Sequence, residues 1–146
     1  MNQIHDKRDV ALVQLRQAIQ LYDDEDFICS LTLAGAAEEI LGKIAKARSG
    51  ENALQQDVDF VNEIVESAQN AGLTAAAATP KELISRRNRL RNEAKHAKEE
   101  PSGSVSGDFE VAADEMIDRT LRNWSLAFGD YPDDPVIQEY LSRYDH

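Results

Sequence analysis

Along nearly the whole of this 146-residue chain, apolar residues recur at spacings of three and four. This spacing gathers apolar side chains on one face of an α-helix, whereas a half-buried strand would need strict alternation. The clearest example runs from about Phe27 to Ala47, FICSLTLAGAAEEILGKIAKA, and is apolar over much of its circumference until Glu38. We therefore expect an all-α protein in which this segment is the central and most buried helix.

Capping and turn residues divide the remaining sequence into further helices. They are expected from about Asp6 to Tyr22, Ala53 to Ala71, Thr79 to Glu100 and Asp108 to Phe128, with a short last helix beginning at Asp134-Pro135. The sequence has no convincing strand pattern, internal repeat or long heptad, and its length suits one domain. Together these features predict a single domain over residues 1–146, an antiparallel up-and-down bundle of four to five long helices plus a short C-terminal helix.

The helix expected from Thr79 has the best-defined start. Thr79 and Glu82 are spaced to cap each other's backbone N–H groups, and Pro80 stands where its missing N–H does no harm. Apolar residues then recur at helical spacing, which predicts a buried stripe. The members of this stripe are Leu83, Leu90, Ala94 and Ala97.

The same helix carries the only concentrated positive charge. Between Lys81 and Lys98 there are seven basic and two acidic residues, in a chain whose net charge is −11. Such a basic stripe attracts phosphates locally, although the acidic chain as a whole should not coat nucleic acid. The alternative is structural, because cations are favoured near a helix C-terminus and arginines can pair with acids elsewhere in the fold.

Composition excludes several other classes. The one cysteine, Cys29, cannot form an intramolecular disulfide and is expected to be a small buried side chain. The first ten residues lack the apolar core of a signal peptide and no apolar run is long enough to span a membrane, so a cytoplasmic location is expected. The acidic run at residues 23–26 lacks the spacing and glycine of a calcium loop. No metal or cofactor is expected.

A short polar motif lies late in the Thr79 helix. Arg91 is followed directly by Asn92 and, after four intervening residues, by His96. Arg89, Asn92 and His96 fall close to one helix face, whereas Arg91 lies about 140° from His96 and needs its long side chain to converge. Helix geometry therefore does not choose between the two arginines.

With this motif, the chain resembles the HEPN superfamily, the higher-eukaryote and prokaryote nucleotide-binding domains. The alanine-rich, Glu-Glu-containing segment TLAGAAEEILGKI is similar to an earlier helix of several bacterial members. The resemblance implies an all-α bundle, usually a homodimer, in which two copies of the motif face each other across a cleft.

For active members the resemblance implies metal-independent RNA cleavage, by attack of a 2′-hydroxyl on the adjacent phosphate. His96 would act as general base or acid, Arg91 would hold the phosphate, and Asn92 would position one of them. The phosphate-binding surface would be extended by Arg87, Arg89 and Lys95. Lys98 stands where the toxin variant of the family has a tyrosine, and the KHA tripeptide at 95–97 resembles bacterial members whose activity is unassigned.

Two other functions stay open. In one, the protein is a non-catalytic dimeric interaction or regulatory module with a protein partner, and Asn92 and His96 complete a buried hydrogen-bond network. In the other, Glu93 and His96 form the Glu-x-x-His pair of a di-iron bundle. The second requires another such pair, yet the remaining histidines, His5 and His146, lie near the termini.

Overall fold

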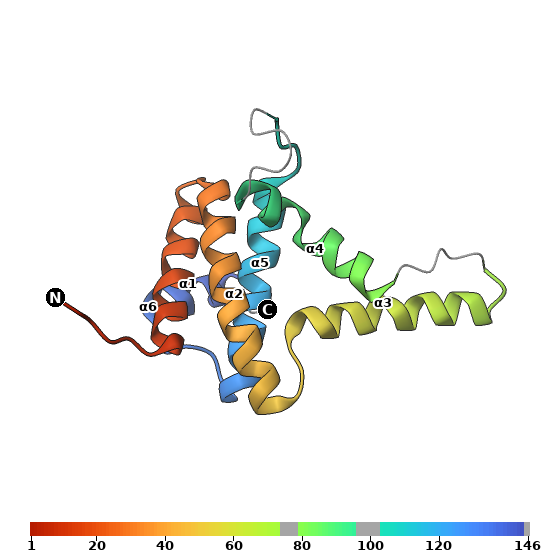
Figure 1. Ribbon diagram of the computed structural model, residues 1–146, viewed down its shortest axis with the longest axis horizontal. Coiled ribbons are helices and arrows are strands. Elements are labelled where there is room, and N and C mark those ends of the chain that lie inside the picture. Colours follow the sequence, from red (N-terminus) through yellow and green to blue (C-terminus); the bar gives the residue numbers. More distant parts are fainter. Residues whose placement is uncertain (74–78, 96–102, 145–146) are drawn as a thin grey trace.

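The computed structural model describes residues 1–73, 79–95 and 103–144, and the part that it describes is helical without strands (Figure 1). The helices are α1 (Lys7–Asp23), α2 (Phe27–Ser49), α3 (Ala53–Asn70), α4 (Pro80–Lys95), α5 (Phe109–Phe128) and α6 (Pro135–Ser142). Their bounds agree with the predicted ones within two residues wherever the ends are described. The all-α class with a short C-terminal helix is therefore confirmed.

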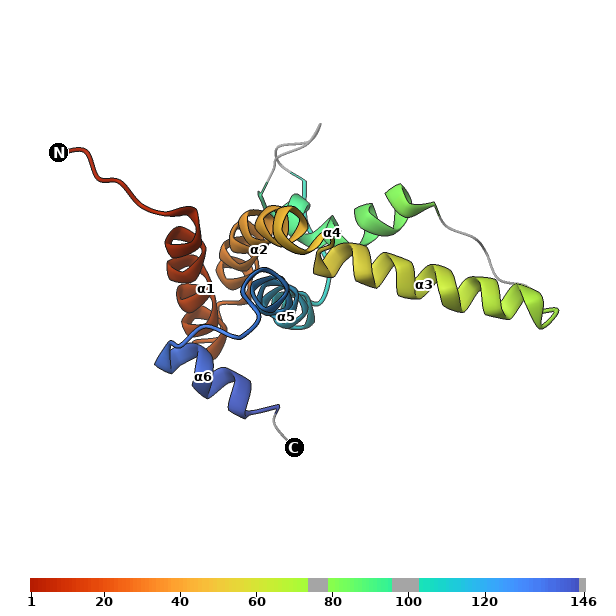
Figure 2. The same cartoon turned by 90° about the horizontal axis from the view of Figure 1, so that it is seen from below.

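Three helices form the body of the molecule. α2 lies between α1 and α5 and packs against both, and α6 lies across α1 (Figures 1 and 2). The buried core is built mainly from leucine, isoleucine and alanine on these facing sides; its large members include Leu15, Ile19, Leu31, Leu41, Ile117 and Ile137. α2 has nine buried residues and α5 has as many, so the two helices share the central place.

Local sequence signals fix where the helices begin and end. Each N-cap side chain accepts a hydrogen bond from a backbone N–H of the first turn, which satisfies a donor that the helix leaves free. These caps are Asp6, Asp26, Asn52, Asp108 and Asp134. Gly50 and Gly129 end α2 and α5 in the left-handed conformation that glycine adopts without strain.

α3 and α4 depart from a simple bundle, because α3 projects away from the body and α4 returns from it to cross the top of α2 and α5 (Figures 1 and 2). Only Ala53 and Val58 of α3 are buried, both near its start. None of residues 59–70 or 80–86 is buried. We call these two segments the arm.

The arm explains several wrong predictions about burial. Apolar residues of α3 recur at helical spacing, yet Ile64 among them is exposed, because no other described segment lies over it. In α4 the expected stripe at Leu83, Leu90 and Ala94 is only half-buried, and Ala97 lies outside the described residues. The buried residues of α4 are instead polar.

One prediction about the body was also wrong. Cys29, expected to be buried, is exposed on the first turn of α2. Cys29 stands in an apolar run but lies on the outward face of α2. The helix turns about 100° per residue, and Cys29 is out of phase with the buried Leu31 and Ala34.

Candidate functional site

The predicted site lies on α4, where the expected start is present. The backbone N–H of Glu82 donates to the Thr79 side-chain oxygen at 3.2 Å, and the N–H of Leu83 donates to the Thr79 carbonyl at 3.0 Å. Pro80 is the first helical residue. The start of the helix predicted from Thr79 and Pro80 is therefore confirmed.

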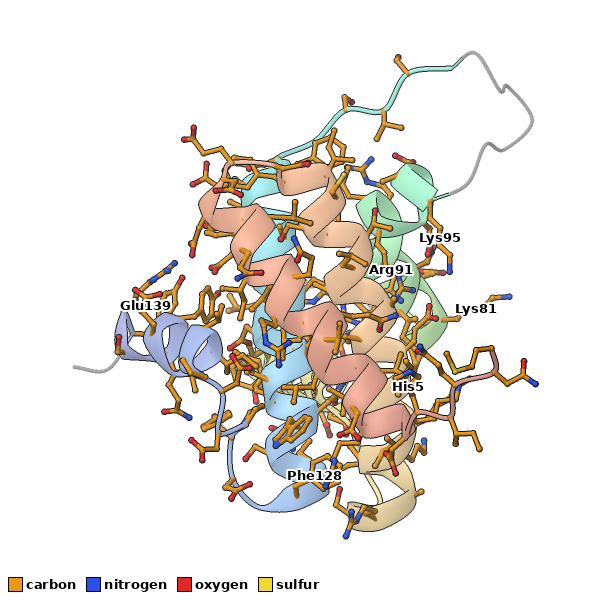
Figure 3. All side chains as sticks on the ribbon, turned by 90° about the vertical axis from the view of Figure 1, so that its left-hand side faces the viewer. His5, Lys81, Arg91, Lys95, Phe128 and Glu139 are labelled. Carbon is orange, nitrogen blue, oxygen red and sulfur yellow. The ribbon has the colours of Figure 1, made fainter. Side chains whose placement is uncertain are left out.

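Arg91, the predicted phosphate-binding residue, points toward α2 and is only 8% exposed (Figure 3). Its Nη1 lies 3.3 Å from Oε2 of the buried Glu38, and its Nη2 lies 3.4 Å from Oε1 of Glu39. The guanidinium is therefore held by two carboxylates of α2. A phosphate would have to displace these contacts to bind Arg91.

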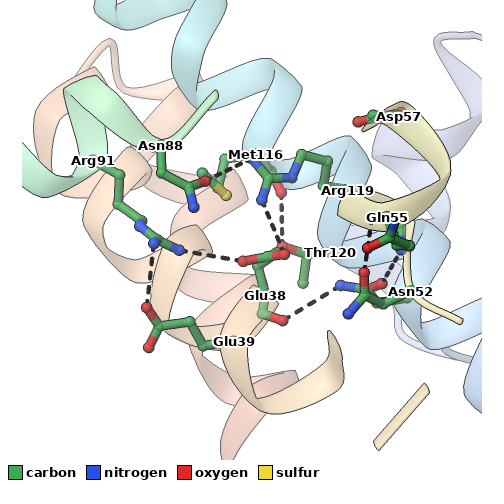
Figure 4. Close-up of polar contacts among 12 residues, drawn as sticks. Glu38, Glu39, Asn52, Gln55, Asp57, Asn88, Arg91, Met116, Arg119 and Thr120 are labelled. Atoms are coloured by element: carbon green, nitrogen blue, oxygen red, sulfur yellow. Dashed lines mark hydrogen bonds and ion pairs between the residues drawn. The ribbon is translucent and has the colours of Figure 1, made fainter. Parts of the chain in front are cut away.

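Glu38 also pairs with a second buried arginine, and Figure 4 shows it between the two guanidinium groups. Nη2 of Arg119, on α5, lies 3.1 Å from Glu38 Oε1, and its Nη1 donates to Asn88 Oδ1 at 3.0 Å. The backbone carbonyl of Glu38 accepts a hydrogen bond from Asn123. We call Glu38, Asn88, Arg91 and Arg119 the buried network; it connects α2, α4 and α5.

The buried network has more positive than negative charge. Two arginines share Glu38, and the third carboxylate contact, Glu39, is half exposed. Burial lowers the pKa of Arg119, which the nearby Glu38 carboxylate partly offsets. The Nε–H of Arg119 is buried without an acceptor in the described structure. A buried donor left unpaired lowers the stability of the fold. The buried network therefore specifies how α2, α4 and α5 pack rather than maximising stability.

A glycine makes room for this arrangement. A Cβ added at Gly35 would lie 2.3 Å from Cδ and 2.9 Å from Cγ of Arg91. Only glycine therefore lets the Arg91 stem cross α2 and reach Glu38. The small side chains at residues 34–37 leave room on this side of α2, and Gly35 admits the arginine.

The other predicted residues have different surroundings. Asn92 is half-buried, and its Oδ1 accepts from Arg91 Nε and Nη2 at 3.4 Å each. Arg89 donates to Glu93 at 3.0 Å and to the Ser106 carbonyl at 3.3 Å. The structure therefore brings Arg91 and Asn92 together, while Arg89 faces the loop that precedes α5.

Arg87 and Lys95 lie on the exposed side of α4, and His96 lies outside the described residues. Arg87 Nη1 is 3.9 Å from Glu115 on α5, which is a loose ion pair between exposed side chains. Figure 3 shows Lys81 and Lys95 directed away from the body. Neither they nor Arg86 form an ion pair with any residue that the structure describes.

The di-iron alternative depends on His96 and so falls partly outside the described residues. Glu93 accepts a hydrogen bond from Arg89. Within residues 1–73, 79–95 and 103–144, no three His, Cys, Asp or Glu side chains are grouped to hold a metal ion.

Sequence reasoning missed Glu38 as a partner and missed Asn88 and Arg119 altogether. A signal was present in α5, where Met116, Arg119 and Asn123 follow one another at spacings of three and four. Polar residues in phase with a helix core predict a buried polar network. That signal, joined to Glu38 in phase with the apolar Leu31 and Leu41 of α2, would have indicated buried pairing.

No helix in the described part of the chain is both long and apolar enough to cross a membrane. No family model matches the chain, and no curated protein or solved structure matches it. Function is therefore inferred from the residues and geometry of the chain itself.

Proposed function

We propose that this chain is a non-catalytic, HEPN-like helical interaction module that pairs with a second copy of itself through the arm. The observation that carries the proposal is the apolar face of α3, where Phe60 is 63% and Ile64 is 52% exposed. Contiguous apolar surface of this kind marks an interaction site in soluble proteins.

The arm gains little stability from the rest of the chain. No residue of α3 after Val58 is buried, and the distal half of the helix contains Val61, Ile64 and Val65, whose β-branched side chains disfavour an isolated helix. Short helices in water owe most of their stability to packing of an amphipathic face. A partner that covers this face would supply that packing.

Charge favours a second copy as the partner. α3 has four acidic and no basic residues, whereas α4 has six basic and two acidic ones. Among the described residues no ion pair joins α3 to α4, because Asp57 pairs with α5 and Arg91 with α2. In a two-fold pair, α3 of each copy would lie against α4 of the other, so each contact would be made twice.

Buried pairing of Arg91 supports a non-catalytic role. An arginine that stabilises charge on a reacting phosphate needs its donors free and directed at the substrate. Here the Arg91 donors are directed at Glu38, Glu39 and Asn92. The motif arginine therefore acts as a structural link between α4 and α2.

Light scattering after size exclusion tests the pairing. The double variant Phe60→Ser/Ile64→Ser should elute as a monomer under conditions where the wild type is a dimer. The control is Val13→Ser/Ile28→Ser, which removes apolar side chains that are 56% and 52% exposed on α1 and α2. The control should remain a dimer. A monomeric wild type, or equal behaviour of both double variants, would refute pairing through the arm.

Phosphate or RNA binding is the second candidate, favoured by the basic side chains of Lys81, Arg86 and Lys95, which form no ion pair within the described part of the chain. In its catalytic form, His96 would be general base or acid and Arg91 would have to leave Glu38. An assay for cleavage of a mixed RNA pool, with EDTA present, distinguishes RNA cleavage from RNA binding alone. If the wild type cuts and a folded His96→Ala variant does not, the chain is a metal-independent ribonuclease and the non-catalytic proposal is wrong.

A further inference from the structure

A cleft of about 650 Å³ lies along α5, between the base of the arm and α6. α5 contributes Asp114, Glu115 and Asp118 to its lining. Tyr131, from the loop before α6, and Tyr140 and Tyr144, from α6 and the residues that follow it, add aromatic rings. None of these residues belongs to the motif on α4 or to the exposed apolar face of α3.

Asp114 is the unusual group in this cleft. The hydroxyls of Tyr140 and Tyr144 both donate to the same oxygen, Oδ1 of Asp114. Asp114 forms no ion pair with any residue that the structure describes, and its second oxygen, Oδ2, accepts no hydrogen bond there. Among the described residues this half-buried carboxylate is held only by neutral donors, and a cation would stabilise it.

The neighbouring charges do not neutralise Asp114. Asp57 and Asp118 both pair with Arg122, so two carboxylates share one guanidinium. Glu115 is 56% exposed, and its ion pair with Arg87 is 3.9 Å long. The third cation on the lining, Arg119, pairs with Glu38. The lining has four carboxylates and three guanidinium groups, so one negative charge is left over.

The phenol groups respond to this negative charge. Burial and the hydrogen bond to Asp114 raise the pKa of Tyr140, and burial raises the pKa of Tyr144 as well. Both hydroxyls therefore stay protonated and stay donors to Asp114. These donors bring no positive charge, so Asp114 has no cationic partner among the described residues.

The aromatic rings suit the same kind of ligand. The face of a tyrosine ring attracts an ammonium or guanidinium group within about 6 Å of its centre. Arg143 already lies over the Tyr140 ring, with its Cζ 5.5 Å from the ring centroid. Tyr131 and Tyr144 are 44% and 53% exposed, so their rings remain available.

We propose that this cleft binds an organic cation, an alkylammonium or guanidinium group, with Asp114 as its counter-ion and the tyrosines as its walls. Such a group occurs as a Lys or Arg side chain of a peptide and in free polyamines. The cleft is separate from the arm, so the proposal of cation binding can be tested independently of pairing between copies.

Isothermal titration of the full chain at physiological salt tests the proposal, with N-acetyl-lysine amide as the peptide probe and spermidine as the free polyamine. N-acetyl-norleucine amide, which has a similar stem without charge, is the control ligand. Asp114→Asn removes the charge but keeps an oxygen that can accept from both tyrosines. Asp59→Asn makes the same change on the exposed side of α3, where the new amide oxygen can still accept from Gln55.

We expect the lysine probe to bind and the norleucine probe not to bind. Asp114→Asn should weaken cation binding about tenfold, as loss of a charge-assisted contact does, while Asp59→Asn should leave it unchanged. Tighter binding of spermidine would assign the site to polyamines, and tighter binding of the lysine probe would assign it to a basic segment of a protein.

Equal binding of the two amides to the wild type would overturn the proposal. So would equal affinity of the wild type and a folded Asp114→Asn variant. Should Asp114→Asn fail to fold, Tyr131→Ala replaces it, because that exposed side chain makes no hydrogen bond in the described structure. It should weaken cation binding severalfold through loss of the ring, and unchanged affinity would refute the site.

Discussion

Replacing Glu38 by glutamine is the sharpest test of the buried network. The change keeps the size of the side chain and one acceptor oxygen, but it removes the only buried negative charge that the described residues place near the two arginines. The side chains of Glu38, Arg91 and Arg119 are 7%, 9% and 4% exposed. After the change, two guanidinium groups would share a neutral amide, with only the half-exposed Glu39 still facing one of them.

The expected loss of stability is large. At the observed separations of 3.3 and 3.1 Å, each ion pair is worth roughly 5 kcal/mol at an effective dielectric constant of about 20. The cost of desolvating both charges offsets part of this attraction when the pair forms. When one partner is removed, the other charge stays buried and keeps its desolvation cost without the attraction. Loss of one partner from a buried pair typically costs about 3–5 kcal/mol, which is the loss we expect for Glu38→Gln.

Urea unfolding followed by circular dichroism, at one fixed protein concentration, measures this loss. Glu39→Gln is the matched control, because Glu39 is 48% exposed and contacts only Arg91 Nη2. An exposed ion pair contributes at most about 1 kcal/mol, so the control should change little. If both variants lose less than about 1 kcal/mol, the buried network does not hold α4 on the body, and the structural role of Arg91 is refuted.

Two further predictions concern other parts of the fold. Gly35→Ala should destabilise by about 1–3 kcal/mol, since its Cβ would displace the Arg91 stem; urea unfolding that shows no loss would contradict the close approach. Asp134→Ala should cost about 1–2 kcal/mol at pH 7, because Asp134 caps α6 and lies 2.7 Å from Arg16. Burial alone would raise the pKa of Asp134, but the hydrogen bonds from Arg16 and α6 outweigh it and lower the pKa below 3.8. Stability from this carboxylate is therefore present above pH 3.8 and lost as pH falls through the lowered pKa, so the wild type and the variant should converge in acid. A difference that persists unchanged below that pH would contradict this role.

Helix positions could be predicted from the sequence because the signals are local. Asp108 and Asp134 cap the helices that they were expected to begin. Core phases were likewise legible where one apolar face is wide, as in α5. These features depend on residues a few positions apart, and neighbouring side chains settle them.

Arg91 and α3 show why the rest could not be predicted. Arg91 looked free because its partner Glu38 is 53 residues away, and nothing local announces that pair. The apolar residues of α3 recur at the spacing of an amphipathic helix, which indicates that one face needs to be covered. The spacing does not indicate whether the same chain or another molecule covers that face. An apolar stripe on a helix of the body and one on the arm have the same spacing, so the sequence does not distinguish them.

Hydrogen–deuterium exchange across a range of protein concentrations tests pairing through the arm most directly. Residues 61–70 of α3 have no buried side chain within one chain, so their amides should be protected only when a partner covers them. We predict strong protection at high concentration that is lost on dilution, while the amides of α2 stay protected throughout. Protection of residues 61–70 that does not change with concentration, or that is absent at every concentration, would contradict the proposed pairing.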